Sequence, residues 1–205
     1  MRRIDTRVIT EIGLAVALAA VLNLPFLRLQ LPFNVAGGTI ALNMLPLFVV
    51  ALRRGVGPGV IAGALYGVVD ALVDPFIVHP VQFLLDYPVA YGLTGLAGLA
   101  SGFIRKVGKT GVLRWPIMLV GLLIGVIARF GSHWIAGIVF FGSYAPEGQP
   151  VWLYSLIYNA GYLLPSLALT AIGAFAVMPV LERAVPVAAR EARNGSIGDR
   201  GDSDS

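Results

Sequence analysis

The sequence contains no cysteine, so disulfide bonds and thiolate metal sites are excluded. Histidine is almost as scarce. The two histidines, His79 and His133, have no pair of glutamates nearby, and a zinc site normally needs three or four such ligands. We therefore expect neither a metal nor a cofactor in this protein.

Charged residues are also few, at 13% of the 205 residues, while 57% are hydrophobic. A soluble domain carries about 25% charged residues, so this composition indicates a protein of the cell membrane that crosses it several times. Each of six apolar stretches is long enough, or nearly so, to span a bilayer: 8–27, 38–53, 56–73, 79–104, 115–143 and 152–181. We expect an all-α integral membrane protein with a six-transmembrane-helix bundle over residues 1–182. The polar segment 183–205 is expected to be a disordered tail.

The basic residues predict which side of the membrane each end occupies. Thirteen of the 15 lysines and arginines fall before the first stretch, after the second, between the fourth and fifth, and after the sixth. By the positive-inside rule, these regions and both termini are cytoplasmic. Only Arg28 and Arg129 depart from this pattern. The net charge of +4 is thus a topology signal, and we expect no nucleic-acid partner.

The N-terminus resembles the basic region of a signal peptide. However, the apolar run behind it ends at Asn23-Leu24-Pro25, which offers no small-residue cleavage site, so we expect a retained first helix. This helix carries Ala15 and Ala19, a pair of small residues four apart. Such a pair lets another helix approach closely, either from within the bundle or from a partner protein.

A polar and aromatic stripe runs along the fourth stretch. Its members recur at three- and four-residue steps, which places them on or beside one helical face: His79, Gln82, Phe83, Asp86, Tyr87 and Tyr91. An aspartate in the middle of a membrane costs roughly 3 kcal/mol, so its presence there indicates a function or a fixed partner.

The fifth and sixth stretches carry polar residues that face the same region. His133 and Asn159 fall at depths similar to that of Asp86, and tyrosines and phenylalanines surround them. A small, flat ligand with hydrogen-bonding edges and a positive charge would suit such a site, although a polar cluster that only stabilises the bundle is the alternative. Arg129 lies deep in the fifth stretch, where we expect a structural pair with a carboxylate ahead of ligand contact.

No nucleotide-binding motif accompanies this pocket. Residues 102–110, GFIRKVGKT, have five residues between their glycines, whereas a P-loop has four. Any ATP that drives transport must therefore be hydrolysed by another chain. The sequence also lacks a nucleophile–base motif, which ranks an intramembrane enzyme last.

Four segments, in order, resemble the thiamine-binding S component of energy-coupling factor transporters. They are GGTIALNMLP at 37–46, HPVQFLLDYP at 79–88, GSYAPEG at 142–148 and YSLIYN at 154–159. The resemblance covers nearly all of the chain except the tail. It implies a six-helix bundle that binds thiamine from outside. It also implies a partner module of one transmembrane coupling protein and two cytoplasmic ATPases, which the Ala15–Ala19 pair would face.

The resemblance also assigns ligand-binding roles by position. The acid–tyrosine pair of the family falls on Asp86 and Tyr87, its histidine on His133, its ring-stacking position on Phe141, and its helix-six residues on Tyr154 and Asn159.

Three positions depart from the family pattern. Asp86 replaces the usual glutamate, Phe141 replaces a tryptophan, and the first loop lacks the family's tryptophan, for which Phe33 would stand in. These departures leave open a related thiamine precursor or another vitamin as the ligand. A self-sufficient proton-coupled carrier that uses Asp86, His133 and Arg129 as a relay is a further alternative.

Overall fold

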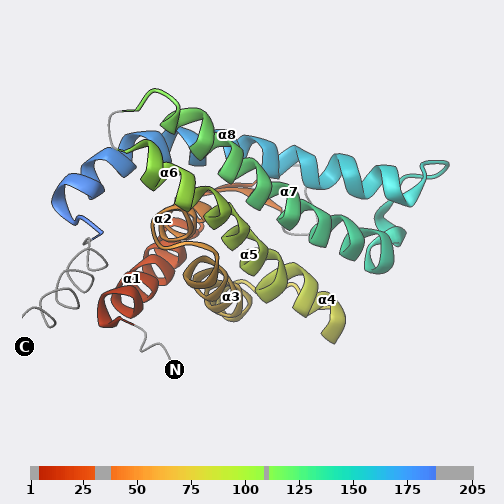
Figure 1. The fold of residues 1–205 in the computed structure, drawn as a ribbon. Helices are drawn as coiled ribbons and strands as arrows, with labels where there is room; N and C mark the ends of the chain where they lie inside the picture. Colours follow the sequence, from red (N-terminus) through yellow and green to blue (C-terminus); the bar gives the residue numbers. More distant parts are fainter. Residues whose placement is uncertain (1–4, 31–37, 109–110, 188–205) are drawn as a thin grey trace, which may run out of the picture.

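The computed structural model describes residues 5–30, 38–108 and 111–187, and these are predominantly helical (Figure 1). The first half contains α1 (Thr6–Leu22), β1 (Leu29–Gln30), β2 (Thr39–Ile40), α2 (Met44–Arg54) and α3 (Val56–Val73). One long helical rod follows, made of α4 (Pro80–Leu84), the π-helical turn η1 (Leu85–Val89), α5 (Ala90–Leu93), the 3₁₀ segment η2 (Thr94–Ala100) and α6 (Ser101–Val107). The last elements are α7 (Arg114–Phe140), the 3₁₀ turn η3 (Gly142–Tyr144) and α8 (Val151–Ala184).

Four of the described helical segments are long and apolar enough to cross a membrane: Val56–Val73, Pro80–Val107, Arg114–Phe140 and Val151–Ala184. They match the third to sixth predicted stretches closely. α1 has 17 residues, and α2 has only 11, or about 16 Å of helix against about 30 Å of hydrocarbon. The chain is therefore a multi-span helical membrane protein, whereas the count of six spanning helices stays a prediction.

The predicted second stretch, 38–53, is divided between two elements. Its outer part forms β2, which pairs antiparallel with β1 through Leu29–Ile40 and Gln30–Thr39. The helix α2 begins only after Asn43, whose side-chain amide donates to the hydroxyls of Tyr66 and Tyr91, at 3.0 Å each. Because this amide is bonded to neighbouring helices, it anchors the start of α2 inside the bundle.

One end of the bundle collects buried and half-buried arginines. Arg54 makes two hydrogen bonds to Glu11, which joins the end of α2 to α1, and Arg53 donates to the Val185 carbonyl after α8 at 2.8 Å. Arg114 at the start of α7 pairs with Glu182 of α8 at 2.6 Å. The α7–α8 connection lies at the opposite end (Figure 1). Arg53, Arg54 and Arg114 thus lie at one end of the bundle, as the positive-inside rule predicts. That this end is cytoplasmic remains a prediction.

The main core lies where α2, η2, α7 and α8 meet. Its buried side chains are mostly large and apolar, and the largest of those that are fully buried are Phe48, Met44, Leu52, Met118, Leu122, Leu163 and Met178. Each of these is at most 1% exposed, so the core is closed to lipid. The outward faces of α1, α3, α7 and α8 instead carry exposed leucine, isoleucine and valine, as expected for helices that meet lipid.

Glycines bring α3 into backbone contact with the rod. A Cβ atom at Gly63 would collide with the Tyr91 carbonyl, and one at Gly67 would collide with the Tyr87 carbonyl. Small residues allow such close approach between membrane helices. The contact matters for function because it fixes α3 beside the polar stripe of the rod.

Ala15 and Ala19 lie inside the bundle, which corrects their expected exposure to a partner. They are 5% and 0% exposed and pack with Leu47, Val50 and Tyr66 of α2 and α3. Their small side chains let α1 approach its own neighbours. The other small pair on α1, Gly13 and Ala17, is exposed. The outward small-residue face is therefore displaced by two residues from the predicted one.

Two predictions concern segments outside the described residues. The disordered tail begins at 183, and only its first residues, 183–187, are described, with α8 extending to Ala184. Residues 31–37, including Phe33, also lie outside the described part, so the stand-in for the first-loop tryptophan stays a prediction.

We predict that Gly63→Ala lowers the free energy of unfolding by about 1–3 kcal/mol, because the added methyl group must displace backbone. Gly57→Ala is the matched control on the same helix, since a Cβ there meets nothing within 4 Å. Thermal unfolding of the detergent-purified variants measures both effects. Equal losses in the two variants would contradict the close packing of α3 on the rod.

Candidate ligand-binding pocket

A pocket lies between α3, the rod, α7 and α8, toward the end that carries the α7–α8 connection. All six predicted ligand residues line it: Asp86, Tyr87, His133, Phe141, Tyr154 and Asn159. They come from three separate helical segments and from the cap of α7. The structure thus brings the predicted residues together around one pocket.

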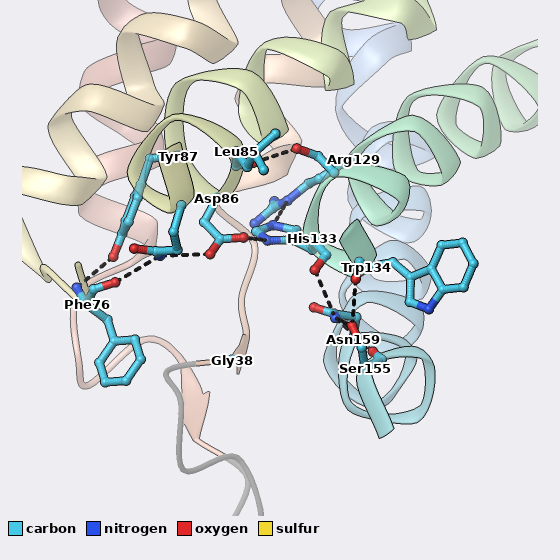
Figure 2. A network of polar contacts seen from close by, with 12 residues as sticks. Gly38, Phe76, Leu85, Asp86, Tyr87, Arg129, His133, Trp134, Ser155 and Asn159 are labelled. Atoms are coloured by element: carbon cyan, nitrogen blue, oxygen red, sulfur yellow. Dashed lines mark hydrogen bonds and ion pairs between the residues drawn. The ribbon is translucent and has the colours of Figure 1, made fainter. Parts of the chain in front are cut away.

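Asp86, His133 and Arg129 form a chain of polar contacts across the pocket (Figure 2). The Asp86 Oδ1 atom lies 2.8 Å from His133 Nδ1, and Arg129 Nε donates to His133 Nε2 at 3.2 Å. Arginine has only donors, so His133 Nε2 must accept and its proton must be on Nδ1. His133 is therefore a neutral imidazole that donates to Asp86.

The second carboxylate oxygen of Asp86 is held from its own helix. Gln82 Nε2 donates to Asp86 Oδ2 at 2.8 Å and also reaches the Phe76 carbonyl at 3.1 Å. The Gln82 Oε1 atom accepts from the Val78 backbone N–H at 3.0 Å. Because Gln82 is only 1% exposed and fully engaged, it fixes the orientation of the Asp86 side chain.

A π-helical turn places Asp86 and Tyr87 toward the pocket. Pro88 lies inside this turn, and proline has no N–H to donate to the preceding turn of helix. The Leu85 carbonyl, at the first residue of the turn, accepts from Ser132 Oγ of α7 at 2.6 Å. Single π-helical turns are frequent at functional sites because they re-aim side chains. Here the turn also ties the rod to α7.

The Tyr87 hydroxyl is occupied by backbone atoms. It accepts from the Phe76 N–H at 2.7 Å and lies 3.3 Å from the Asp74 carbonyl, to which it donates. These contacts hold the connection between α3 and α4 over the rod. Tyr87 therefore presents its ring to the pocket, and its hydroxyl positions Phe76, another lining residue.

Asn159 is fixed by α7 and α8 (Figure 2). Its amide nitrogen donates to the Ser155 carbonyl at 2.8 Å, and its Oδ1 accepts from the Tyr162 hydroxyl at 2.9 Å. Ser155 Oγ in turn donates to the Trp134 carbonyl at 2.9 Å. Asn159 is 3% exposed, so its amide is part of a rigid wall.

Aromatic rings cover much of the remaining wall. Phe141 lies 5.9 Å from Phe76, and Tyr154 lies 5.8 Å from Tyr158, measured between ring centroids. All four line the pocket. Such rings bind flat heterocycles by stacking and attract cations through their faces.

The structure corrects the predicted partner of Arg129. Its guanidinium carbon lies 3.8 Å from the centroid of the Tyr91 ring, and its Nε contacts His133. Among the described residues, the ion pairs do not include Arg129. The arginine is compensated by an aromatic face and by the dipole of an imidazole bonded to Asp86, rather than by direct contact with a carboxylate.

Two members of the predicted stripe lie away from the pocket. His79 caps the start of α4, where its Nδ1 accepts from the Val81 N–H, and its ring stacks on Phe140. Phe83 also lies outside the lining. The stripe is narrower than predicted, in part because His79 is the extended N-cap residue and α4 begins only at Pro80.

Sequence reasoning missed Asp70, which we expected to be an unremarkable outer carboxylate. Asp70 lines the pocket and accepts from Asn23 Nδ2 at 2.6 Å and from the Tyr66 hydroxyl at 3.0 Å. Asp74 also lines it and forms an ion pair with Arg28 at 2.5 Å. A signal existed, since Asp70 follows Tyr66 by four residues and shares a face with Gly63 and Gly67.

The charges around the pocket do not cancel. Three carboxylates and two guanidinium groups line it, namely Asp70, Asp74, Asp86, Arg28 and Arg129. With His133 neutral, these side chains sum to a formal charge of −1. A cation would therefore be favoured over an anion in this pocket.

Comparison with known proteins identifies the family. The family model described as thiamine transporter protein matches residues 9–186. The chain belongs to this family. It is 40% identical over 166 residues to the thiamine transporter ThiT of Bacillus subtilis. The aligned region covers 79% of this chain and 85% of that protein. It is 36% identical over 173 residues to ThiT of Lacticaseibacillus paracasei, with 80% and 83% covered.

A solved structure supports the same relationship. ThiT from Listeria monocytogenes superimposes with a TM-score of 0.74 at 26% identity, over 89% of this chain and 97% of that one. The family consists of transport proteins, so the chain is not an enzyme. Together with its apolar helices, this membership makes the chain a multi-pass protein of the cell membrane.

Proposed function

We propose that this chain is the substrate-binding subunit of an energy-coupling factor importer and binds thiamine from outside the cell. The observation that carries the proposal is the pocket itself, in which the six predicted residues meet within a wall of charge −1. Thiamine combines a cationic thiazolium ring with an aminopyrimidine. Membership of the thiamine transporter family supports this ligand over other cationic heterocycles.

The chain of polar contacts gives Asp86 a specific role. His133 and Gln82 each use one of its oxygens, and a carboxylate has further lone pairs for a third donor. We assign this capacity to the amino group of the pyrimidine. A charge-assisted hydrogen bond of this kind contributes about 1.5–3 kcal/mol. The rings of Phe141 and Tyr154 would stack against the heterocycles.

We predict that thiamine changes the intrinsic tryptophan fluorescence of the purified protein, because Trp134 directly follows the pocket-lining His133 in α7 and its backbone carbonyl accepts from Ser155 of the pocket wall. Asp86→Asn should weaken binding by roughly tenfold to a hundredfold, since it removes the charge and keeps the shape. Asp86→Glu should have a mild effect or improve affinity, as glutamate is usual in the family. An unchanged dissociation constant with a lower melting temperature in Asp86→Asn would show that Asp86 only supports the fold.

The partner module follows from what the sequence lacks. Without a P-loop, ATP-driven transport by this chain needs other proteins to hydrolyse ATP. We assign hydrolysis to two cytoplasmic ATPases and the connection between them and this chain to a transmembrane coupling protein. The exposed pair Gly13 and Ala17 on α1 is the surface we propose for the coupling protein. A Cβ at Gly13 would meet nothing within 4 Å, so this face is open in the isolated chain.

We predict that Gly13→Leu combined with Ala17→Leu abolishes thiamine uptake in cells while leaving binding by the purified protein unchanged, because bulky residues prevent close helix approach. Gly131→Leu is the matched control on α7, where a Cβ also has open space. Uptake of radiolabelled thiamine and the fluorescence titration measure the two quantities. If binding and uptake fall together, the pair has a structural role instead.

A proton-coupled carrier is the second candidate, and one observation favours it. Asp86, His133 and Arg129 are contiguous, with contacts of 2.8 and 3.2 Å, as a proton relay requires. The acceptor role of His133 toward a buried arginine opposes this alternative, because a protonated imidazole would face a guanidinium.

We predict that the chain alone, reconstituted in vesicles, binds thiamine without concentrating it, whether or not a proton gradient is imposed. Concentrative uptake that depends on the gradient would establish the carrier instead. Vesicles that contain the Asp86→Asn variant serve as the control, and the thiamine that they retain is subtracted as the background.

A further inference from the structure

A second cavity lies on the flank of the bundle. α1 and α8 both pack against α2, and a groove of about 700 Å³ is lined by α1, α2 and the last turns of α8 (Figure 1). Among the described residues, none lines both this groove and the ligand-binding pocket. Sites that bind small molecules usually have volumes of about 300–1,000 Å³, so the groove is large enough for a ligand of its own.

The charged residues of the groove all lie at one end. They come from the start of α1 and from the end of α2, and they are Arg7, Glu11, Arg53 and Arg54. Three arginines and one glutamate give this end a formal charge of +2. It is the same end of the bundle that the positive-inside rule assigns to the cytoplasm.

The wall beyond the arginines is apolar and open to the membrane. Leu14, Leu18 and Val21 line it from α1 and are 59%, 54% and 49% exposed. From Arg7 to Leu22 the groove follows α1 for about 22 Å, whereas one leaflet contributes about 15 Å of hydrocarbon. The groove therefore extends from the arginines through the depth of one leaflet. Its shape suits a ligand with a negative head and an apolar body.

Arg53 has a donor that the protein does not use. Its side chain is 3% exposed, and its Nη2 atom donates to the Val185 carbonyl at 2.8 Å and lies 3.5 Å from Glu11 Oε1. Arg54 engages Glu11 more closely, with contacts of 2.7 and 2.5 Å. The Nη1 atom of Arg53 has no hydrogen-bond partner among the described residues. A buried donor without a partner is costly, and phosphate oxygens accept charge-assisted hydrogen bonds from arginine.

We propose that this groove binds one anionic phospholipid, with its phosphate at Arg53 and Arg7 and its acyl chains along Leu14 and Leu18. Arg7 is exposed, and the ion pairs of the described residues do not include it. Basic pockets between helices at the cytoplasmic side bind anionic headgroups, and the cytoplasmic leaflet is rich in anionic lipids. The inference is independent of the proposed function, because the groove and the thiamine pocket are separate.

Native mass spectrometry of the detergent-purified full chain tests the proposal. The probes are dioleoylphosphatidylglycerol, which carries a net negative charge, and dioleoylphosphatidylcholine, which has the same acyl chains and no net charge. We expect one phosphatidylglycerol per chain, bound roughly tenfold more tightly than phosphatidylcholine, because the groove has an excess of arginine. Equal affinities for the two lipids would overturn the proposal.

Charge variants test the headgroup end. Arg7→Gln should weaken phosphatidylglycerol binding about fivefold and leave phosphatidylcholine binding unchanged. Arg105→Gln is the matched control, since it removes the same charge from an exposed position on α6 outside the groove. Arg53→Gln should abolish most of the preference for phosphatidylglycerol. Equal effects of Arg7→Gln and Arg105→Gln would show that only the overall charge matters, which contradicts a site in the groove.

A groove-filling variant tests the apolar wall. Leu18→Trp should weaken phosphatidylglycerol binding roughly tenfold, whereas Leu65→Trp on α3, at a similarly exposed position outside the groove, should not. If Arg53→Gln fails to fold, Arg7→Gln and Leu18→Trp still decide the matter. Unchanged lipid binding in Leu18→Trp would overturn the proposal and leave the groove to a helix of a partner protein.

A soluble phosphate distinguishes a lipid site from a site for a free anion. Glycerol 3-phosphate presents a phosphate without acyl chains, so it should not displace phosphatidylglycerol from the wild-type protein. Displacement by glycerol 3-phosphate at concentrations comparable to those of the lipid would show that the arginines bind a free phosphate, and the lipid proposal would be wrong.

Discussion

The cost of burying charge in an apolar bundle organises this protein. Asp86 is inside a helix that faces lipid on its other side, and an uncompensated carboxylate there would be too expensive to retain. His133 and Gln82 compensate it by hydrogen bonds, and Arg129 is compensated by the Tyr91 ring and His133. Each partner comes from a helix that must then keep its position. The polar pocket is therefore also a clamp between the rod and α7 (Figure 2).

The same clamp depends on backbone features that contribute no charge. Gly63 and Gly67 allow α3 to lie directly on the rod, which brings Asp70 to the wall of the pocket. Pro88 accompanies the π-helical turn that aims Asp86 and Tyr87, and Ser132 satisfies the Leu85 carbonyl beside it. The hydrogen bonds in the pocket thus depend on close helix packing outside it. A small change in helix spacing would separate Asp70 and Asp86 from their partners.

Much of this arrangement could be predicted from the sequence, because hydrophobic length and helical period identify spans and faces directly. The last four spans and the convergence of Asp86, His133 and Asn159 follow from those patterns. The short α2, the burial of Ala15 and Ala19, and the Tyr91 partner of Arg129 could not, since each depends on which helix lies against which. Asp70 was missed for a related reason: its position near the helix end suggested solvent, whereas Asn23 at the end of α1 and Tyr66 of α3 both contact it.

The central claim is that one pocket of charge −1 between α3, the rod, α7 and α8 holds thiamine. An experimental structure of the protein with bound thiamine tests it most directly. The account predicts density for the ligand in this pocket, with the aminopyrimidine toward Asp86 and the Asp86–His133 contact preserved. Density at another surface, or an orientation that places the aminopyrimidine away from Asp86, would contradict the account.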